Sequence, residues 1–589
     1  MEQRINKLLR KFLVWRIRHM SQQTFVYLLS IVVGFLTGLA AVTLKNVTHL
    51  IQHLVTTSNY HGIFYFAFPV IGIVITVLIK RAFSGPVGEG IPSTLHAISK
   101  RNGILARYKM YASMVTSAIT VGFGGSVGLE GPAVSTGSAI GSNIGKLMHL
   151  DYKTRILLIS CATAGAIATI FNAPIAAIIF TIEIFSLDLT IASLIPLLLA
   201  SVSGSVTSIF INNRQEYLLN YKLTEAFSIN ELPAYILLGV ICALISVYFT
   251  KMYFQVEGLF GKVKKPLYQT ILGGLVLGFL IFLIPPLYGE GFTTINAILK
   301  GDLDSVFQNS LFEHLSENQY VIIMLFAGLV IFKVFATAIT IGAGGVGGVF
   351  APSLFMGSSV GFIVARGLNM LNFNVSESNF ALAGMAGLMA GVMHAPLTAI
   401  FMIAEITGGY ELIIPLMLTA SLSFIFTRQF LPHTIYTKQL ARRGELITHD
   451  KDRAILTLMN MKEIVEDNFV PVQREDSLGD LVVTFKRSNR NLFPVIDKDG
   501  QLTGVLTLDD FKQLLFDSSQ YDKIKVSELM YSPPAVVNAN DTMEEVMNKF
   551  RHSNAWNLPV TENGKYIGFI SKSKLFSVYR RKLKQVSRE

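Results

Sequence analysis

Long apolar stretches, interrupted by glycine and proline, fill the first three quarters of the chain, and a mixed polar pattern follows them. Five apolar runs are long enough to cross about 30 Å of hydrocarbon as helices: 24–45, 62–80, 232–254, 267–287 and 321–341. Others are expected to be too short to span alone, and they begin or end at Gly-Pro or Ala-Pro pairs at 131–132, 173–174, 351–352 and 395–396. Lipid tolerates such breaks only where the freed backbone groups are buried in protein or line a cavity. The pattern predicts a polytopic α-helical membrane protein whose broken helices meet near mid-membrane.

The apolar region is duplicated. Residues 120–132 (TVGFGGSVGLEGP) recur without a gap at 340–352 (TIGAGGVGGVFAP), and residues 164–184 match 386–406. The tripeptide Gly88-Glu89-Gly90 has an echo at 289–291. Duplicated segments broken by glycine and proline at equivalent places are typical of transporters whose site lies between the repeats. We therefore expect a membrane domain at 21–440, with repeats at about 21–215 and 232–440 and a site built from both glycine-rich loops.

Composition and charge exclude an ordinary soluble globule. Charged residues make up 15% of the chain and hydrophobic residues 51%, whereas soluble domains are roughly a quarter charged. The basic segments 1–20 and 438–453 place both termini in the cytoplasm by the positive-inside tendency. The net charge of +11 then reflects topology rather than nucleic-acid binding. Cys161 and Cys242 lie in apolar segments, which argues against a disulfide framework or a metal site.

The polar tail is itself duplicated. After a linker at 441–460, segments 469–472, 492–496 and 502–508 read as short strands, with helical spacing at 477–488. LFPVIDKDGQLTGVLTLDDF in the first half of the tail matches NLPVTENGKYIGFISKSKLF in the second. The tail is therefore predicted to contain two β-α-β-β-α units, at 461–519 and 526–585.

Three motifs in the membrane domain carry a family resemblance. They are Gly88-Glu89-Gly90-Ile91-Pro92, Gly128-Leu129-Glu130-Gly131-Pro132 and Gly348-Val349-Phe350-Ala351-Pro352, with Tyr436 near the end of the domain. With these motifs the chain resembles the CLC family of chloride channels and proton/chloride antiporters, and its tail resembles a tandem of CBS domains. The resemblance implies an inverted-repeat CLC fold, a homodimer in the bacterial inner membrane, and chloride exchanged for protons. It implies no enzymatic activity and no required cofactor.

Glycine-rich loops that run into a proline suit the anion site that this resemblance implies. Proline fits the first turn of a helix, and a helix start offers free amide donors with about half a positive charge. Several such starts bind an anion without a full cation, so a halide can also leave. The predicted anion-binding residues are Gly88, Glu89, Gly90, Ile91, Gly128, Leu129, Gly131, Gly348, Val349, Phe350, Ala351 and Tyr436. By resemblance, Val349 and Phe350 offer backbone amides, and the Tyr436 hydroxyl forms the inner gate.

Glu130 lies in the middle of one of these loops, in an acid-poor membrane region. A carboxylate there is an intramolecular anion that can occupy the site, and then swing out or take a proton when chloride displaces it. The resemblance assigns this position the gating glutamate and outer proton carrier. The alternative interpretation is a capping carboxylate at a helix start.

The sequence departs from the family pattern at positions that bear on protons and selectivity. Glu89 stands where the family usually has Ser or Pro, and an ionised carboxylate 4 Å from chloride would repel it by roughly 4 kcal/mol. We infer that Glu89 points away from the pore or is mostly protonated, and is then a secondary proton carrier. Ile184 occupies the position of the inner proton-relay glutamate of many antiporters, which keeps a passive, gated chloride channel as the alternative function. Glu183 recurs in the second repeat as Glu405. Two interpretations of Glu183 therefore stay open, a structural role in helix capping or in the dimer and a role as proton carrier. Leu129 replaces the usual Arg.

In CBS pairs, a Gly-x-x-Thr/Ser-x-x-Asp run places its acid on the ribose of an adenine nucleotide. Gly504, Thr507 and Asp510 fit that run in the first copy, while the second copy has Gly568 and Ser571 but Lys574 at the acid position. The pair either binds an adenine nucleotide or only braces a dimer, and the sequence leaves both interpretations open.

A membrane enzyme or a sensor with a membrane anchor is a further alternative for the function of the whole chain. It is disfavoured because the membrane region has no nucleophile with its base, HExxH or P-loop.

Overall fold

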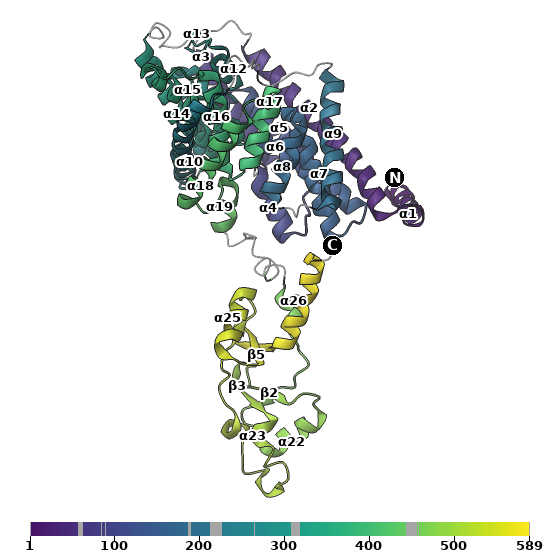
Figure 1. The fold of residues 1–589 in the computed structure, drawn as a ribbon. Coiled ribbons are helices and arrows are strands. Elements are labelled where there is room, and N and C mark those ends of the chain that lie inside the picture. The colour runs from purple at the N-terminus through teal and green to yellow at the C-terminus, as the bar shows by residue number, and fades with distance from the viewer. Residues whose placement is uncertain are drawn as a thin grey trace. The chain divides into compact units, whose positions relative to one another are not determined.

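The chain consists of two compact units, Met1–Leu446 and Ile447–Glu589, which are the membrane unit and the tail (Figure 1). The structure is a computed structural model. It describes residues 2–56, 63–83, 85–88, 90–186, 190–212, 219, 227–263, 265–307, 318–442, 456 and 459–587.

The described residues of the membrane unit form two series of eight helices in matching order. The first series is α2 (Gln22–Thr56), α3 (Ile63–Arg81), α4 (Gly90–Lys100), α5 (Lys109–Gly122), α6 (Glu130–Leu147), α7 (Tyr152–Phe171), α8 (Pro174–Phe185) and α9 (Ile191–Asn212). The second is α10 (Leu232–Gly261), α11 (Pro266–Leu283), α12 (Phe292–Lys300), α14 (Gln319–Gly342), α15 (Phe350–Met370), α16 (Glu377–Met393), α17 (Pro396–Thr407) and α18 (Ile413–Phe430). Outside the two series lie α1 (Glu2–His19), η1 (Ile229–Glu231), η2 (Pro285–Leu287), α13 (Asp304–Phe307) and α19 (Ile435–Arg442). The equivalent helices α4 and α12 lie toward opposite ends of this unit, as an inverted repeat requires (Figure 1).

Eight helical segments among the described residues are long and apolar enough to span a membrane. The short helices expected at the proline breaks are present as α8 and α17, which have 12 residues each and are therefore about 18 Å long. The expectation is wrong for α15 and α7, which have 21 and 20 residues and are among the eight spans. Proline in a first turn sets where a helix begins, and it leaves the length to the residues that follow.

Glycines bring neighbouring helices of each repeat into close contact. In α6, a Cβ added to Gly137 would lie 2.8 Å from the Ala162 carbonyl oxygen of α7. In α15, Gly357 and Gly361 lie directly against the backbone of α16, and a Cβ at Gly357 would be 2.7 Å from the Met385 Cα. Small residues allow membrane helices to approach in this way. The matched glycines thus fix the α6–α7 and α15–α16 pairs that carry the glycine-rich loops.

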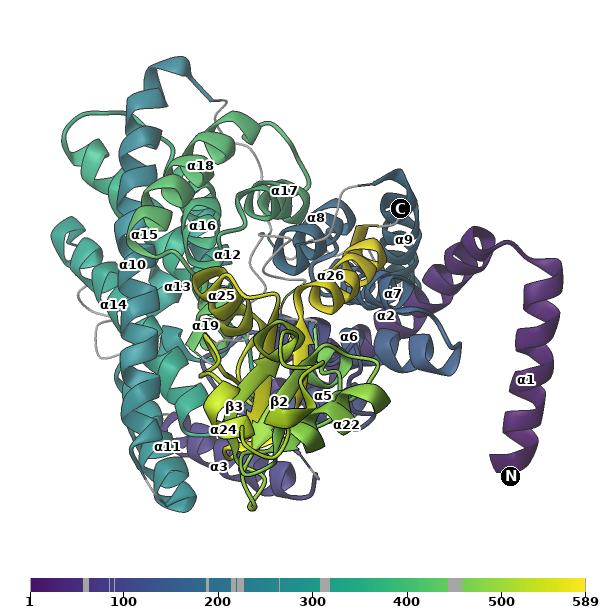
Figure 2. The same cartoon turned by 90° about the horizontal axis from the view of Figure 1, so that it is seen from below.

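The two repeats also share the backbone conformation of one interhelical turn. Asn172 after α7 and His394 after α16 have identical backbone angles, φ 54° and ψ 38°, in the left-handed region. Each is followed by Ala-Pro, and the proline begins the short helix α8 or α17. These two helices lie side by side (Figure 2).

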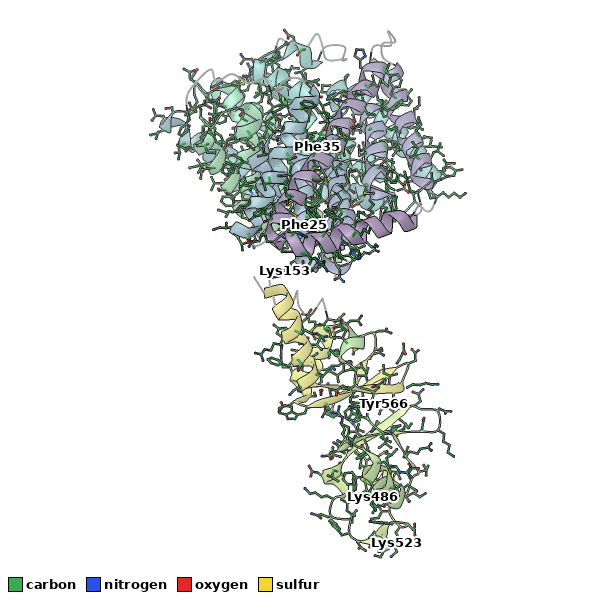
Figure 3. The ribbon with its side chains drawn as sticks, turned by 90° about the vertical axis from the view of Figure 1, so that its right-hand side faces the viewer. Phe25, Phe35, Lys153, Lys486, Lys523 and Tyr566 are labelled. Atoms are coloured by element: carbon green, nitrogen blue, oxygen red, sulfur yellow. The ribbon has the colours of Figure 1, made fainter. Side chains whose placement is uncertain are left out.

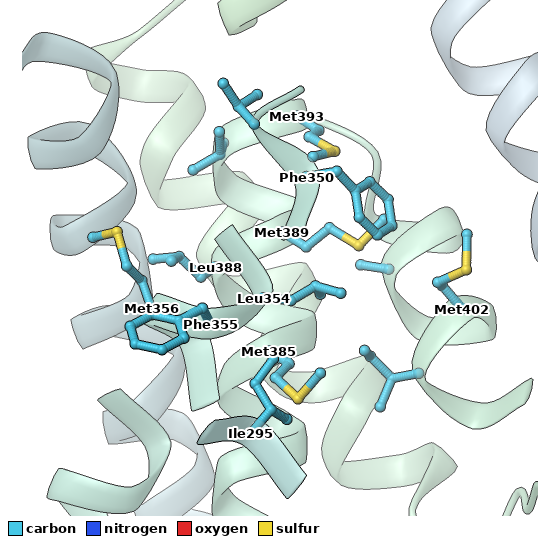
Figure 4. Packing of buried hydrophobic residues seen from close by; sticks show 14 of the residues in the cluster. Ile295, Phe350, Leu354, Phe355, Met356, Met385, Leu388, Met389, Met393 and Met402 are labelled. Atoms are coloured by element: carbon cyan, nitrogen blue, oxygen red, sulfur yellow. The ribbon is translucent and has the colours of Figure 1, made fainter. Parts of the chain in front are cut away.

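The core of the membrane unit forms where α15, α16 and α17 meet. Phe350 and Leu354 of α15 pack in one buried cluster with Met385 and Met389 of α16 and Met402 of α17 (Figure 4). Figure 3 shows Phe25 and Phe35 on α2 in the same unit. Because Phe350 is completely buried, the start of α15 is held rigidly by this cluster.

The tail contains two three-stranded sheets of the same design. Their orders are β1-β2-β3 and β4-β5-β6, and each has one parallel and one antiparallel pair. The strands are β1 (Val472–Gln473), β2 (Leu492–Ile496), β3 (Leu502–Thr507), β4 (Val537–Asn538), β5 (Asn557–Glu562) and β6 (Lys565–Ser571). The helices are α21 (Met461–Ile464), α22 (Leu478–Arg487), α23 (Leu508–Phe511), η4 (Ser518–Gln520), α24 (Val526–Leu529), α25 (Met543–Ser553) and α26 (Lys572–Ser587). Lys486, Lys523 and Tyr566 mark this unit in Figure 3. The strand expected at 469–472 is shorter and begins later, at Val472.

Candidate anion-binding site

The three glycine-rich loops meet at one place in the membrane unit. Gly128 and Gly348 form an antiparallel bridge in which each N–H donates to the carbonyl of the other, at 2.9 and 2.8 Å. The first loop joins them, because a Cβ added to Gly90 would lie 3.7 Å from the Gly131 Cα. The sequence motifs therefore place the starts of α4, α6 and α15 around a common point. Three helix starts concentrate amide donors and positive dipole ends there.

Glu130, the first residue of α6, directs its carboxylate into this point. Phe350 N–H donates to Glu130 Oε1 at 2.7 Å. The carboxylate fills the space beside Gly128 and Gly348, so neither position has room for a side chain. The residue is 1% exposed, and Oε2 has no hydrogen-bond partner among the described residues. The side chain thus lies as an anion would, against the amide donors of α15.

The loop before α15 presents one of the two amides predicted as donors from the third motif, that of Phe350, to Glu130. The amides of Phe350 and Ala351 both interact with the Glu130 carboxylate. Val349 is buried and serves as the N-cap residue of α15. The predicted donor at Phe350 is therefore in contact with the Glu130 carboxylate, whereas no donation from Val349 is seen among the described residues.

Tyr436 reaches the same region from α19, which packs against α4. The residue is 7% exposed, and its hydroxyl is buried without a hydrogen-bond partner among the described residues. It lies within electrostatic range of Glu130. A buried hydroxyl without a partner costs roughly 1–3 kcal/mol, so this group is available to donate to an anion.

The two glycines of the first motif contribute backbone to the site. Gly88 has φ +96° and Gly90 has φ +52°, angles that favour glycine, and Ile91 is buried at the start of α4. Gly88 lies against the Val346 side chain in the loop before α15. Glu89 lies outside the described residues.

Glu183 and Glu405 cap each other's repeats. Glu183 accepts hydrogen bonds from Thr398 N–H at 2.8 Å and from the Thr398 hydroxyl at 2.5 Å, at the start of α17. Glu405 accepts from Ala176 N–H at 2.8 Å, at the start of α8. Each carboxylate therefore satisfies amides that a helix start leaves free. Ile184, beside Glu183, is buried and apolar.

Two ionisable residues near Glu130, the half-buried Glu290 and the completely buried Lys333, were missed by the sequence reasoning. Glu290 Oε1 accepts a hydrogen bond from Leu129 N–H at 3.1 Å, one residue before Glu130. Lys333 is completely buried in α14, and its Nζ donates to the Gly289 carbonyl at 3.0 Å. The echo of residues 88–90 at 289–291 and a lysine inside an apolar run were the available signals.

The predicted nucleotide residues of the tail form a local cap. Asp510 Oδ2 accepts from Thr507 N–H and from the Thr507 hydroxyl, both at 2.6 Å, at the start of α23. In the second copy, the Ser571 hydroxyl donates to Glu466 at 2.6 Å, and Glu466 pairs with Arg490 at 2.7 Å. The two copies thus present different chemistry at equivalent positions.

Comparison with known proteins identifies the family. The sequence model described as "Voltage gated chloride channel" matches residues 71–428, and that described as "CBS domain" matches 461–517 and 526–581. The chain belongs to the voltage-gated chloride channel (CLC) family. Members of this CLC family are transporters and channels rather than enzymes, and the chain carries a CBS pair beside its CLC domain.

Named relatives and solved structures of CLC proteins agree with this assignment. The H(+)/Cl(-) exchange transporter ClcA of Vibrio cholerae is 26% identical over 71% of this chain and 89% of its own. The voltage-gated ClC-type chloride channel ClcB of Escherichia coli is 27% identical over 56% of this chain and 75% of its own. A slow cyanobacterial Cl-/H+ antiporter superimposes with a TM-score of 0.60 at 23% identity, over 72% of this chain and 98% of its own. A eukaryotic CLC transporter superimposes with a TM-score of 0.61 at 19% identity, over 94% of this chain and 99% of its own. These structures establish the CLC fold of the chain.

Proposed function

We propose that the chain transports chloride across the membrane and exchanges it for protons moving the other way, with Glu130 as gate and outer proton carrier. The observation that carries this proposal is the Glu130 carboxylate itself, which accepts the Phe350 N–H among three converging helix starts. An anion in a transport pathway binds to such partial charges more weakly than to a full cation, so it can also leave the site.

The mechanism follows from competition for the same donors. Chloride and the ionised Glu130 carboxylate are both single negative charges, so they exclude each other from the donors at the start of α15. Protonation removes the charge of Glu130 and weakens its hold on the Phe350 amide, because hydrogen bonds to an ionised acceptor are the stronger ones. The neutral side chain then leaves with its proton while chloride enters. Tyr436, whose buried hydroxyl has no hydrogen-bond partner among the described residues, then donates to the ion.

The test is simultaneous chloride and proton flux in sealed liposomes under a chloride gradient. We expect the wild type to move protons uphill, and the Glu130→Gln variant, which has no titratable group there, to lose this movement while still passing chloride. Chloride flux without proton movement in the wild type would contradict antiport and identify a passive channel, the outcome that Ile184 leaves open. A Glu89→Gln variant in the same assay reports whether that carboxylate shares the proton path.

The proposal extends to the assembly and its surroundings. The family resemblance favours a homodimer with a complete pathway in each subunit, placed in the inner membrane with both termini in the cytoplasm. The basic residues near both ends of the membrane unit support that orientation. Mass measurement of the detergent-solubilised protein tests the dimer.

We also propose that the first CBS copy binds an adenine nucleotide. This proposal rests on the run of Gly504, Thr507 and Asp510 in its sequence.

A further inference from the structure

Two oppositely charged residues, the half-buried Glu290 and the completely buried Lys333, interact electrostatically near Glu130 and have no part in the exchange cycle described above. Glu290 stands in the loop between η2 and α12, and Lys333 stands in the middle of α14. Lys333 has no exposed surface. A buried cation within a membrane domain costs several kcal/mol to insert, so it is retained where it has a specific partner.

The loop that carries Glu290 is fixed to the gate from two sides. Lys333 Nζ donates to the Gly289 carbonyl at 3.0 Å and to the Leu287 carbonyl at 3.4 Å. The Ser126 hydroxyl, from the loop before α6, donates to the same Leu287 carbonyl at 2.6 Å. Lys333 Nζ also lies 4.7 Å from the ring centre of Phe355, a residue of α15 drawn in Figure 4. The loop that carries Glu290 is therefore anchored by Lys333 of α14 and by Ser126 of the loop before α6.

Glu290 connects this arrangement to the gating residue. Its Oε1 accepts from Leu129 N–H at 3.1 Å, so it holds the residue that immediately precedes Glu130. Among the described residues, the charged groups that interact with its carboxylate are Lys45 on α2, Lys333 on α14 and Glu130 at the start of α6. A fixed negative charge near a carboxylate favours the protonated form of that carboxylate, and a positive charge disfavours it.

We propose that Glu290 is a positioning residue of the Glu130 gate. Its hydrogen bond to Leu129 fixes the start of α6, and its charge, offset by Lys333, sets the pH range over which Glu130 leaves the anion site. The inference rests on the proposed role of Glu130 as a protonatable gate. Glu290, to which it assigns a function, is the counterpart of Glu89 in the second repeat.

The test compares the pH dependence of chloride flux in liposomes at equal pH on both sides. Glu290→Gln keeps an oxygen that can accept the Leu129 N–H and removes only the charge. Glu130 should then lose its proton more readily, so the pH of half-maximal flux moves to lower values by about one unit. Lys333→Met should move the midpoint in the opposite direction, and Lys333→Arg, which keeps charge and donors, should leave it near that of the wild type. The double variant Glu290→Gln/Lys333→Met should return toward the wild type.

A purely structural role gives a different result. Loss of maximal flux and of thermal stability in Glu290→Gln, with an unmoved pH midpoint, would overturn the proposal, as would a midpoint that moves to higher pH. Glu290→Gln decides this by itself if Lys333→Met fails to fold. The proposed antiport fails separately, when the wild type moves no protons uphill. Even in that case a pH-dependent chloride flux still measures the effect of Glu290 on the gate.

Discussion

The two carboxylate oxygens of Glu130, the proposed gate, lie in different environments. Its Oε1 has a backbone donor at 2.7 Å, whereas its Oε2 is buried and has no hydrogen-bond partner in the part of the chain that the structure describes. The carboxylate therefore has fewer hydrogen bonds than it could accept, which favours its position in the site without fixing it there. A fully satisfied carboxylate would hold the site closed, because each charge-assisted hydrogen bond contributes about 1.5–3 kcal/mol. The geometry thus suits a group that competes with an external anion.

Glu183 and Glu405 provide a matched pair for separating stability from proton transfer. Replacing either by Gln turns an accepting oxygen into an NH₂ group that faces helix-start donors, so we expect each variant to lower stability by about 1–3 kcal/mol. Thermal unfolding of the purified protein measures the loss. Both variants should keep the proton-to-chloride ratio of the wild type. A loss of coupling in Glu183→Gln that Glu405→Gln does not share would instead make Glu183 a proton carrier.

Residue identity alone did not reveal the whole site. Gly128, Glu130, Gly348 and Phe350 were found because they stand in spaced motifs, and the structure brings these four together. The sequence showed Glu290 only as part of the repeat of residues 88–90 and predicted no role for it. Sequence alone does not reveal which backbone amide a carboxylate will contact. The contact between Glu290 and Leu129 is a product of tertiary packing.

At the scale of elements, the sequence predicted where helices begin more reliably than where they end. Pro174 and Pro396 begin α8 and α17, and the helix start next to Pro352 was also anticipated. The length of α15 was not, because the small residues after Pro352 lower its hydropathy. Those residues are there for packing against α16, as Gly357 and Gly361 show, and not because the helix is short.

The α15–α16 contact predicts a large difference between two glycines of one helix. A Cβ at Gly361 would lie 2.8 Å from the Ala381 Cα and even closer to the Phe380 backbone, whereas a Cβ at Gly367 meets nothing within 4 Å. Gly361→Ala must therefore push the start of α16 away from the middle of α15, and we expect a loss of stability of about 1–3 kcal/mol together with reduced anion flux. Gly367→Ala should be neutral or stabilising by up to about 1 kcal/mol. Thermal unfolding and liposome flux of both variants check this, and equal behaviour would show that the two helices can move apart without cost.

At the scale of the whole molecule, the internal duplication was the most informative property of the sequence. It predicted the order of helices in the second half from the first, and it placed the site between the repeats. It did not predict the mutual capping by Glu183 and Glu405, which depends on α8 and α17 lying side by side. The tail was recognised through a second duplication, and its two sheets have the same strand order.

The division of the chain predicts that transport belongs to the membrane unit alone. Every described residue of the candidate site lies between Gly88 and Tyr436, before the boundary at Leu446. A solved antiporter is matched over 98% of its length by 72% of this chain, so the CLC fold does not require a tail of this kind. A chain that ends at Leu446 should therefore keep chloride flux within about twofold of the full-length protein, and Glu130→Gln should still abolish its proton movement.

The tail should then act on the rate only through a ligand. If the first CBS copy binds adenine nucleotide, added nucleotide should change flux in the full-length protein and leave the shortened chain unaffected. Asp510→Asn weakens the acceptor that caps Thr507, and should remove the nucleotide effect without changing basal flux. Lys574→Ala, at the equivalent position of the second copy, is the matched control and should retain the effect. A shortened chain that is monodisperse but passes no chloride would contradict this division of labour, because the tail would then be needed for transport itself.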